Sequence, residues 1–189
     1  MLPWVYEVKR KMIHISLIIF PLAYAFGVSK ELLTALLVSG LAGILTLEIL
    51  RIDFRMEIPL LSLFRQRERN LSGASFMFLG MILAISAFSK PVAIAVMLMT
   101  TLGDAASALV GKSIGKCLVW GPRNLEGILA EFGVDLISGC MVFIFFKQPL
   151  YPIFFGALIA TITETLSYRV DDNLVVPLFA GIATSLLLV

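Results

Sequence analysis

The stretch PVAIAVMLMTTLGDAASALV, residues 91–110, decides the class of fold, because its twenty residues include a single charged side chain, that of Asp104. A helix needs roughly 20 mostly apolar residues to cross the hydrocarbon of a bilayer. Six further runs have the same character. They are Met12–Val28, Leu32–Leu50, Ser72–Ser89, Ile128–Phe146, Pro149–Tyr168 and Asn173–Val189. Because a chain in lipid must pair its own backbone groups, these runs predict about seven helices.

The composition of the whole chain also indicates a membrane protein. Of its 189 residues, 59% are hydrophobic and 15% are charged, and the mean hydropathy is +0.98. Soluble domains are nearer half apolar and a quarter charged, so a soluble enzyme, a disordered chain and a disulfide-stapled secreted domain are excluded. The net charge of +2 gives no support for a nucleic-acid partner. We therefore expect an all-α, polytopic transmembrane bundle that forms one integral-membrane domain over residues 1–189.

The basic residues are distributed unevenly between the two sides of the predicted bundle. Twelve of the fifteen Lys and Arg residues fall in the connections on one side, and only Lys30, Lys90 and Lys147 fall on the other. Cytoplasmic loops of membrane proteins are enriched in Lys and Arg, so the pattern predicts a multi-pass protein with a cytoplasmic N-terminus. The two long connections, 51–71 and 111–127, then lie on the cytoplasmic side, and loops of that length are usually functional.

Several carboxylates lie inside or at the ends of the apolar runs, although a charge at mid-bilayer costs at least about 2.5–3.5 kcal/mol. They are Glu48, Asp104, Glu131, Asp135 and Glu164. Glu48 is explained equally well by an ordinary pair with Arg51 at a helix end. Asp104 lies among small residues, where a carboxylate facing a cavity suits a divalent cation bridged to phosphate oxygens. Glu131 and Asp135 lie one helical turn apart, so they repel unless one is protonated or a cation lies between them.

The segment GKSIGK, residues 111–116, contains part of a phosphate-binding pattern. A P-loop requires a further glycine where this chain has Ala106, and a preceding strand where a membrane helix is predicted, so it is not a P-loop. We nevertheless expect a flexible basic segment at the cytoplasmic surface, whose backbone N–H groups and lysines cradle phosphate. The sole histidine, His14, is either an interfacial residue or a catalyst.

Five segments, in order along the chain, resemble the CTP-dependent lipid-alcohol kinases, a family that includes dolichol and polyprenol kinases, phytol kinase and CTP-dependent diacylglycerol kinases. They are RKMIH at residues 10–14, Glu68 with LSGA at 71–74, GDAA at 103–106 with the two Gly-Lys pairs, NLEGILA at 124–130, and Glu164 with DDNLVVPL at 171–178. The resemblance covers residues 10–178. In one departure, the family's lysine before the Glu-Gly pair is replaced by Arg123 and Asn124.

The resemblance implies a single catalytic domain that transfers the γ-phosphoryl group of CTP to a polyprenol-, dolichol- or diacylglycerol-type lipid within the membrane. The implied cofactor is Mg²⁺ or another divalent cation. The implied catalytic residues are Asp104, His14 and Glu126, and the general base is open between Asp104 and His14. The implied metal ligands are Asp104, Glu126 and Asp172. The implied nucleotide-binding residues are Lys11, Gly111, Lys112, Gly115, Lys116, Arg123 and Asn173. Glu68, Glu131, Asp135, Glu164 and Asp171 are further candidates.

Two other functions stay open. CTP-dependent cytidylyl transfer, as in CDP-diacylglycerol and CDP-archaeol synthases, uses the same nucleotide and cation, but the signature that marks the bacterial enzymes is absent. A non-enzymatic transporter often carries inverted repeats, and no repeat is visible here. The sequence does not identify the acceptor lipid, and it leaves a homo-oligomer open.

Overall fold

The computed structural model describes residues 3–54, 71–167 and 170–188, and it confirms an all-α bundle. The helices are α1 (Pro3–Ser16), α2 (Ile19–Ala25), α3 (Lys30–Ile52), α4 (Gly73–Ala87), α5 (Lys90–Leu98), the π-helix η2 (Met99–Gly103), α6 (Asp104–Ile114), α7 (Leu125–Phe145), α8 (Tyr151–Leu166) and α9 (Asp172–Leu186). Strands β1 (Leu118–Trp120) and β2 (Arg123–Asn124) pair as an antiparallel hairpin.

Each predicted run corresponds to a helical rod. Three rods are long and apolar enough to cross a membrane: α3, the continuous rod α5–η2–α6, and α7. The remaining apolar helices, Lys11–Ala25, α4, α8 and α9, are shorter. The first run differs from a single helix, because it is divided between α1 and α2 at Leu17 and Ile18.

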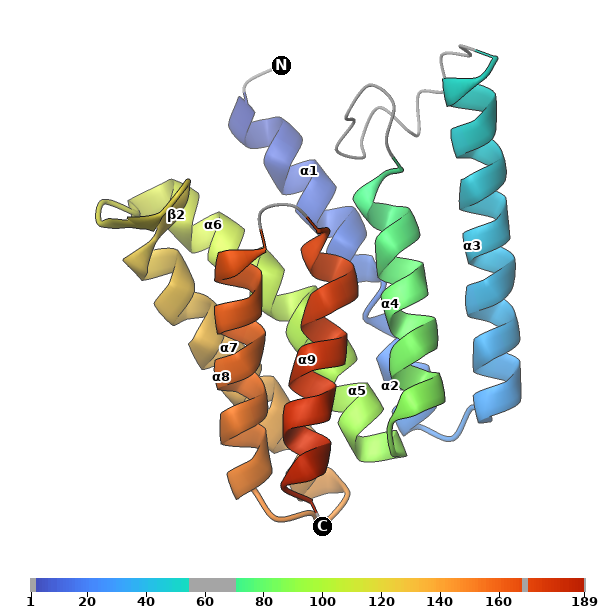
Figure 1. The fold of residues 1–189 in the computed structure, drawn as a ribbon, viewed down its shortest axis with the longest axis vertical. Coiled ribbons are helices and arrows are strands. Elements are labelled where there is room, and N and C mark those ends of the chain that lie inside the picture. The colour runs from blue at the N-terminus through green and yellow to red at the C-terminus, as the bar shows by residue number, and fades with distance from the viewer. Residues whose placement is uncertain (1–2, 55–70, 168–169, 189) are drawn as a thin grey trace.

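Helix α5 is the centre of the bundle. Residues Val92–Met99 are at most 8% exposed, and α5 contacts α2, α4, α7 and α9 (Figure 1). A helix that is apolar all round is expected in such an enclosed position. The outer helices instead present large apolar side chains outward, for example Ile137 on α7 and Ile182 on α9. An apolar exterior of this kind is stable against lipid and unfavourable in water.

Glycines bring together the helices that carry the polar residues described below. A Cβ atom on Gly156 of α8 would overlap the Thr184 hydroxyl of α9, and one on Gly80 of α4 would overlap the Asn173 carbonyl of α9. Small residues at these crossings let the backbones approach closely. The Gly80 contact therefore holds the N-terminal end of α9 against α4, and the Gly156 contact holds the C-terminal end of α9 against the N-terminal half of α8.

The prediction of a flexible loop over residues 111–116 is wrong, because residues 111–114 continue helix α6. The helix ends where the Gly115 N–H donates to the Gly111 carbonyl, at 3.1 Å. The chain then enters the β1–β2 hairpin, whose turn contains Gly121 at a φ of 53°, a conformation that favours glycine.

The N-terminal end of α1, the hairpin, the C-terminal end of α8 and the N-terminal end of α9 lie at one end of the bundle, and the C-terminus lies at the other (Figure 1). We expect the hairpin end to face the cytoplasm, as the distribution of basic residues predicts.

Cys117 is exposed at the hairpin. In a Cys140→Ser background, a membrane-impermeant maleimide should therefore label Cys117 in inverted vesicles but not in intact cells. The added cysteine of Lys147→Cys in a Cys117→Ser, Cys140→Ser background should show the opposite pattern, and reversal of both patterns would overturn the orientation.

Candidate active site

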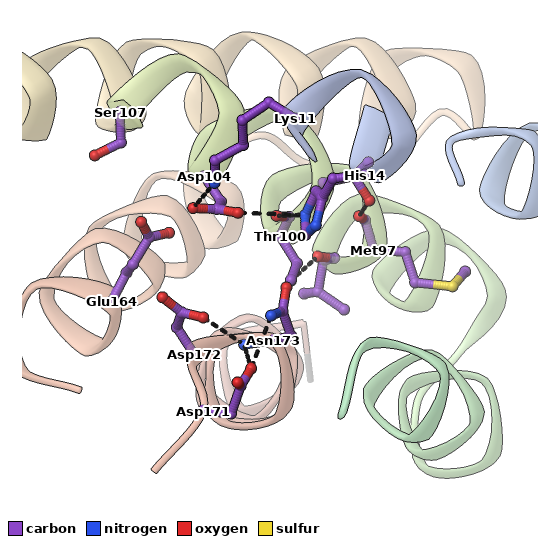
Figure 2. A network of polar contacts seen from close by, with 12 residues as sticks. Lys11, His14, Met97, Thr100, Asp104, Ser107, Glu164, Asp171, Asp172 and Asn173 are labelled. Atoms are coloured by element: carbon purple, nitrogen blue, oxygen red, sulfur yellow. Dashed lines mark hydrogen bonds and ion pairs between the residues drawn. The ribbon is translucent and has the colours of Figure 1, made fainter. Parts of the chain in front are cut away.

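Asp104, the first residue of α6, is a carboxylate in the interior of the bundle and is 8% exposed. Helix α1 supplies its two basic partners: the Lys11 ammonium pairs with Oδ1, and His14 Nε2 lies 3.4 Å from Oδ2 (Figure 2). Lys11 is itself only 1% exposed. Lys11, which the resemblance implied as a nucleotide-binding residue, is therefore an internal counter-charge to Asp104.

The π-helix immediately before Asp104 provides a second partner for His14. The Thr100 carbonyl oxygen lies 3.3 Å from His14 Nε2. A carbonyl oxygen only accepts hydrogen bonds, and the Asp104 carboxylate is also an acceptor, so Nε2 carries the hydrogen. His14 thus acts as a donor toward Asp104 in this arrangement. The Thr100 carbonyl belongs to a π-helical turn, and such turns are frequent at functional sites.

Three carboxylates converge at this end of the bundle from three different helices: Asp104 of α6, Glu164 of α8 and Asp172 of α9. Each offers an oxygen, and these oxygens lie within 4.8 Å of one another. Asp104 and Glu164 are buried, whereas the side chain of Asp172 is 26% exposed and opens the cluster to solvent. Carboxylate oxygens are the ligands that Mg²⁺ prefers, so the residues of this acidic trio fit a divalent cation.

Arg123 of the hairpin closes over the acidic trio. Its Nη1 donates to Glu164 Oε1 at 2.6 Å, and its Nη2 donates to Asp172 Oδ2 at 3.2 Å. Burial lowers the pKa of the Arg123 guanidinium, but the charges of Glu164 and Asp172 raise it by more, and the net shift is upward from the usual value. Arg123 therefore stays charged, and together with Lys11 it places two positive charges against the three carboxylates of the trio.

Glu126, which the resemblance implies as a catalytic and metal-binding residue, is not part of the trio. It lies in the first turn of α7, where its carboxylate accepts from the Cys117 N–H at 3.3 Å. A carboxylate at a helix N-terminus is stabilised by the helix dipole. The third carboxylate beside Asp104 and Asp172 is Glu164, whereas the resemblance implied Glu126 as the third metal ligand. The signal for Glu164 was its position inside an apolar run.

Asn124 links the end of α6 to the start of α7, a role that the sequence did not predict. Its Nδ2 donates to the Gly111 carbonyl at 2.9 Å, and its Oδ1 accepts from the Gly127 N–H at 2.9 Å. A Cβ atom on Gly115 would overlap its amide, and one on Gly111 would approach it to 3.0 Å. Both glycines therefore make room for Asn124, which caps α7. An asparagine directly before a predicted helix was the available signal.

The two lysines of the segment 111–116, Lys112 and Lys116, are exposed near the hairpin.

At the start of α9, Asp171 Oδ1 accepts from the backbone N–H of Asn173 at 3.1 Å and from its Nδ2 at 2.7 Å. This cap fixes the first turn of α9, to which Asp172 belongs. Asn173 and Asp171 thus orient the segment that presents Asp172, and Asn173 is 8% exposed.

Glu131 and Asp135 of α7 are each 1% exposed and lie close to Glu164. Both Glu131 oxygens and Asp135 Oδ1 have no hydrogen-bond partner among the described residues. Asp135 packs against Gly103, where an added Cβ would overlap its carboxylate. Together with the three carboxylates of the trio, Glu131 and Asp135 therefore increase the number of carboxyl groups in this region to five.

The candidate Glu68 lies outside the described residues, as do the arginines at 55, 65, 67, 69 and 169. The described part of the chain brings together Lys11, His14, Asp104, Arg123, Glu164, Asp172 and Asn173 at one end of the bundle. Gly111, Lys112, Gly115, Lys116 and Glu126 lie around the adjacent hairpin.

Three known proteins are similar to nearly the whole chain. The uncharacterized protein RP860 of Rickettsia prowazekii is 32% identical over 96% of this chain and 94% of its own length. The CTP-dependent diacylglycerol kinase 1 of Eremothecium gossypii is 27% identical over 94% of this chain and 66% of its own. The CTP-dependent diacylglycerol kinase 1 of Saccharomyces cerevisiae is 23% identical over 94% of this chain and 72% of its own length. No family model matches the chain, and no solved structure does.

Binding of Mn²⁺, a probe for a Mg²⁺ site, should depend on Glu164 and not on Glu126. In the detergent-purified protein, Glu164→Gln should weaken binding by about 10- to 100-fold, as loss of a group that shapes a metal site typically does. Glu126→Gln removes the same charge at the same end and should leave the affinity unchanged. Electron paramagnetic resonance of free Mn²⁺ measures both, and a loss only in Glu126→Gln would contradict the acidic trio.

Proposed function

We propose that this chain, which belongs to the same family as the rickettsial protein RP860, is a CTP-dependent lipid kinase of the membrane. The observation that carries the proposal is the convergence of three carboxylates and two cationic side chains at one end of an apolar bundle. The two similar proteins named CTP-dependent diacylglycerol kinases support the nucleotide and the reaction class. We propose diacylglycerol as the first acceptor to test, with polyprenol, dolichol and phytol as alternatives.

Phosphoryl transfer depends mostly on positioning the reactants and on neutralising charge. Asp104, Glu164 and Asp172 would hold a divalent cation, which supplies charge neutralisation at the phosphate oxygens when it is bound. Arg123 and Lys11, now paired with these carboxylates, carry the donors that would turn toward a polyphosphate. The exposed lysines near the hairpin, Lys112 and Lys116, add positive charge at the cytoplasmic approach.

The lipid hydroxyl needs a group that accepts its proton, and the choice lies between Asp104 and His14. A general base must have a free lone pair within hydrogen-bond reach of that proton. His14 Nε2 carries a hydrogen toward the Thr100 carbonyl and Asp104, so its lone pair is not available on that side. We therefore propose Asp104 as the base and His14 as the donor that orients it.

The assay that tests this function uses purified protein, CTP labelled at the γ-phosphate, and a panel of lipid alcohols in mixed micelles. Label should appear in the lipid. Asp104→Asn should reduce this transfer by about 10²-fold or more per folded molecule, the range for loss of a general base; size-exclusion chromatography measures the folded fraction, because the change leaves Lys11 buried without its carboxylate. Glu31→Gln, at the opposite end of the bundle, is the matched control with unchanged activity. Label released as pyrophosphate would instead indicate cytidylyl transfer, and wild-type turnover in Asp104→Asn would overturn the assignment.

A second pair of variants, His14→Gln and His14→Ala, tests whether His14 acts as a hydrogen-bond donor or as the general base. The side-chain amide of His14→Gln still donates a hydrogen bond, so kcat should stay within about tenfold of the wild type, whereas His14→Ala should lose more because no donor remains. If His14 were the base, both variants would lose about 10²- to 10⁴-fold. Steady-state kcat at saturating CTP and lipid distinguishes the two results.

A further inference from the structure

A groove of about 920 Å³ lies on the outer side of the bundle, between the β1–β2 hairpin, the C-terminal end of α8 and the N-terminal half of α9. Its wall is mainly apolar. The side chains that matter most here are Trp120 from the hairpin, Ile162 and Leu166 from α8, and Val175 and Phe179 from α9. Pockets that take small organic ligands have volumes of this order and a similar apolar lining.

The groove and the acidic trio use the same two helices. On α8, Glu164 points inward and is 2% exposed, whereas Ile162 and Leu166 on either side are 43% and 58% exposed. On α9, Asp172 lies about one turn before Val175. The groove therefore runs along the outer faces of α8 and α9, whose inner faces carry the carboxylates. Asp172, the partly exposed member of the trio, lies in the sequence between Val170 and Val175, which line the groove.

The hairpin joins the groove to the trio directly. Trp120 and Arg123 are paired in its register; Trp120 lines the groove and Arg123 bonds Glu164 and Asp172. The three residues of β1, Leu118–Trp120, are all more than half exposed although they are apolar. Exposed apolar and tryptophan side chains at the end of a membrane bundle are typical of contact with the interfacial layer of the lipid.

We propose that this groove binds a hydrocarbon chain of the acceptor lipid and thereby presents the lipid's hydroxyl end to the acidic trio at Asp172. The occupant is the lipid alcohol, because the partly exposed Asp172 lies between Val170 and Val175 of the groove wall, and its carboxylate accepts a hydrogen bond from a hydroxyl, a group that a phosphatidylcholine headgroup lacks. The inference rests on the proposed function for the chemistry that follows binding, but the binding itself is measurable without turnover.

The binding experiment uses the fluorescence of Trp120. The chain has two tryptophans, so Trp4→Phe leaves Trp120 as the single reporter. In phosphatidylcholine vesicles, diacylglycerol with brominated chains should quench Trp120 in a saturable way, and more strongly than brominated phosphatidylcholine at the same bromine content. Ile162→Phe, which fills the groove, should abolish this difference. Ile137→Phe makes the same change on the exposed face of α7 and should preserve it.

The kinetic experiment uses the same two variants with intact Trp4. Ile162→Phe should raise the KM for the lipid by about tenfold, the effect of excluding roughly two methylene groups from an apolar site, and should leave the KM for CTP unchanged. Ile137→Phe should change neither constant.

The outcomes separate the inference from the proposed function. Equal quenching by both brominated lipids, or quenching and lipid KM that are unchanged in Ile162→Phe, would overturn the groove as the lipid site while leaving the kinase assignment in place. Selective quenching that Ile162→Phe removes supports the groove, and it does so even if no lipid alcohol is phosphorylated, a result that would contradict the kinase assignment alone.

Discussion

The structure depends on one constraint, the burial of an ionised aspartate in the rod that forms the centre of the bundle. Asp104 follows the most enclosed apolar segment of the described chain. A buried ion is tolerated only when a partner of opposite charge accompanies it, and removal of one partner from such a pair typically costs about 3–5 kcal/mol. Lys11 is the partner, and its side chain is more deeply buried than the carboxylate that it neutralises. Helix α1 is therefore bound to the central rod through the polar contacts of Lys11 and His14.

The same constraint explains why the cationic residues of the trio are suited to a substrate that carries several negative charges. Arg123 and Lys11 are held by carboxylates that converge against their mutual repulsion. A polyphosphate with its cation would exchange these pairs for new ones of the same kind, so binding would leave no charge uncompensated. In this view, the carboxylates keep the basic side chains positioned before the nucleotide arrives.

The fold was predictable from the sequence wherever the decisive property was local. An apolar run is long enough for a helix or it is not, and each of the seven predicted runs corresponds to a rod of the structure. The site was less predictable because its residues meet through packing. Glu164 joins Asp104 and Asp172 only when α6, α8 and α9 converge, and no spacing within the sequence reveals that convergence. Lys11 was counted among the cytoplasmic basic residues and implied as a nucleotide-binding residue, and Gly111 and Gly115 were expected in a phosphate-cradling segment. Neither pattern shows which side chain packs against these residues.

The lengths of α8 and α9 have a consequence for the membrane itself. At 1.5 Å per residue, their 16 and 15 residues span only about 24 Å and 22 Å, against roughly 30 Å of hydrocarbon in a typical bilayer. Such hydrophobic mismatch is relieved when the surrounding bilayer becomes thinner. We expect the headgroup layer beside these two helices to be drawn inward, toward the level of the carboxylates at their ends. The membrane deformation, and not the extraction of a lipid, would then bring a hydroxyl to the site.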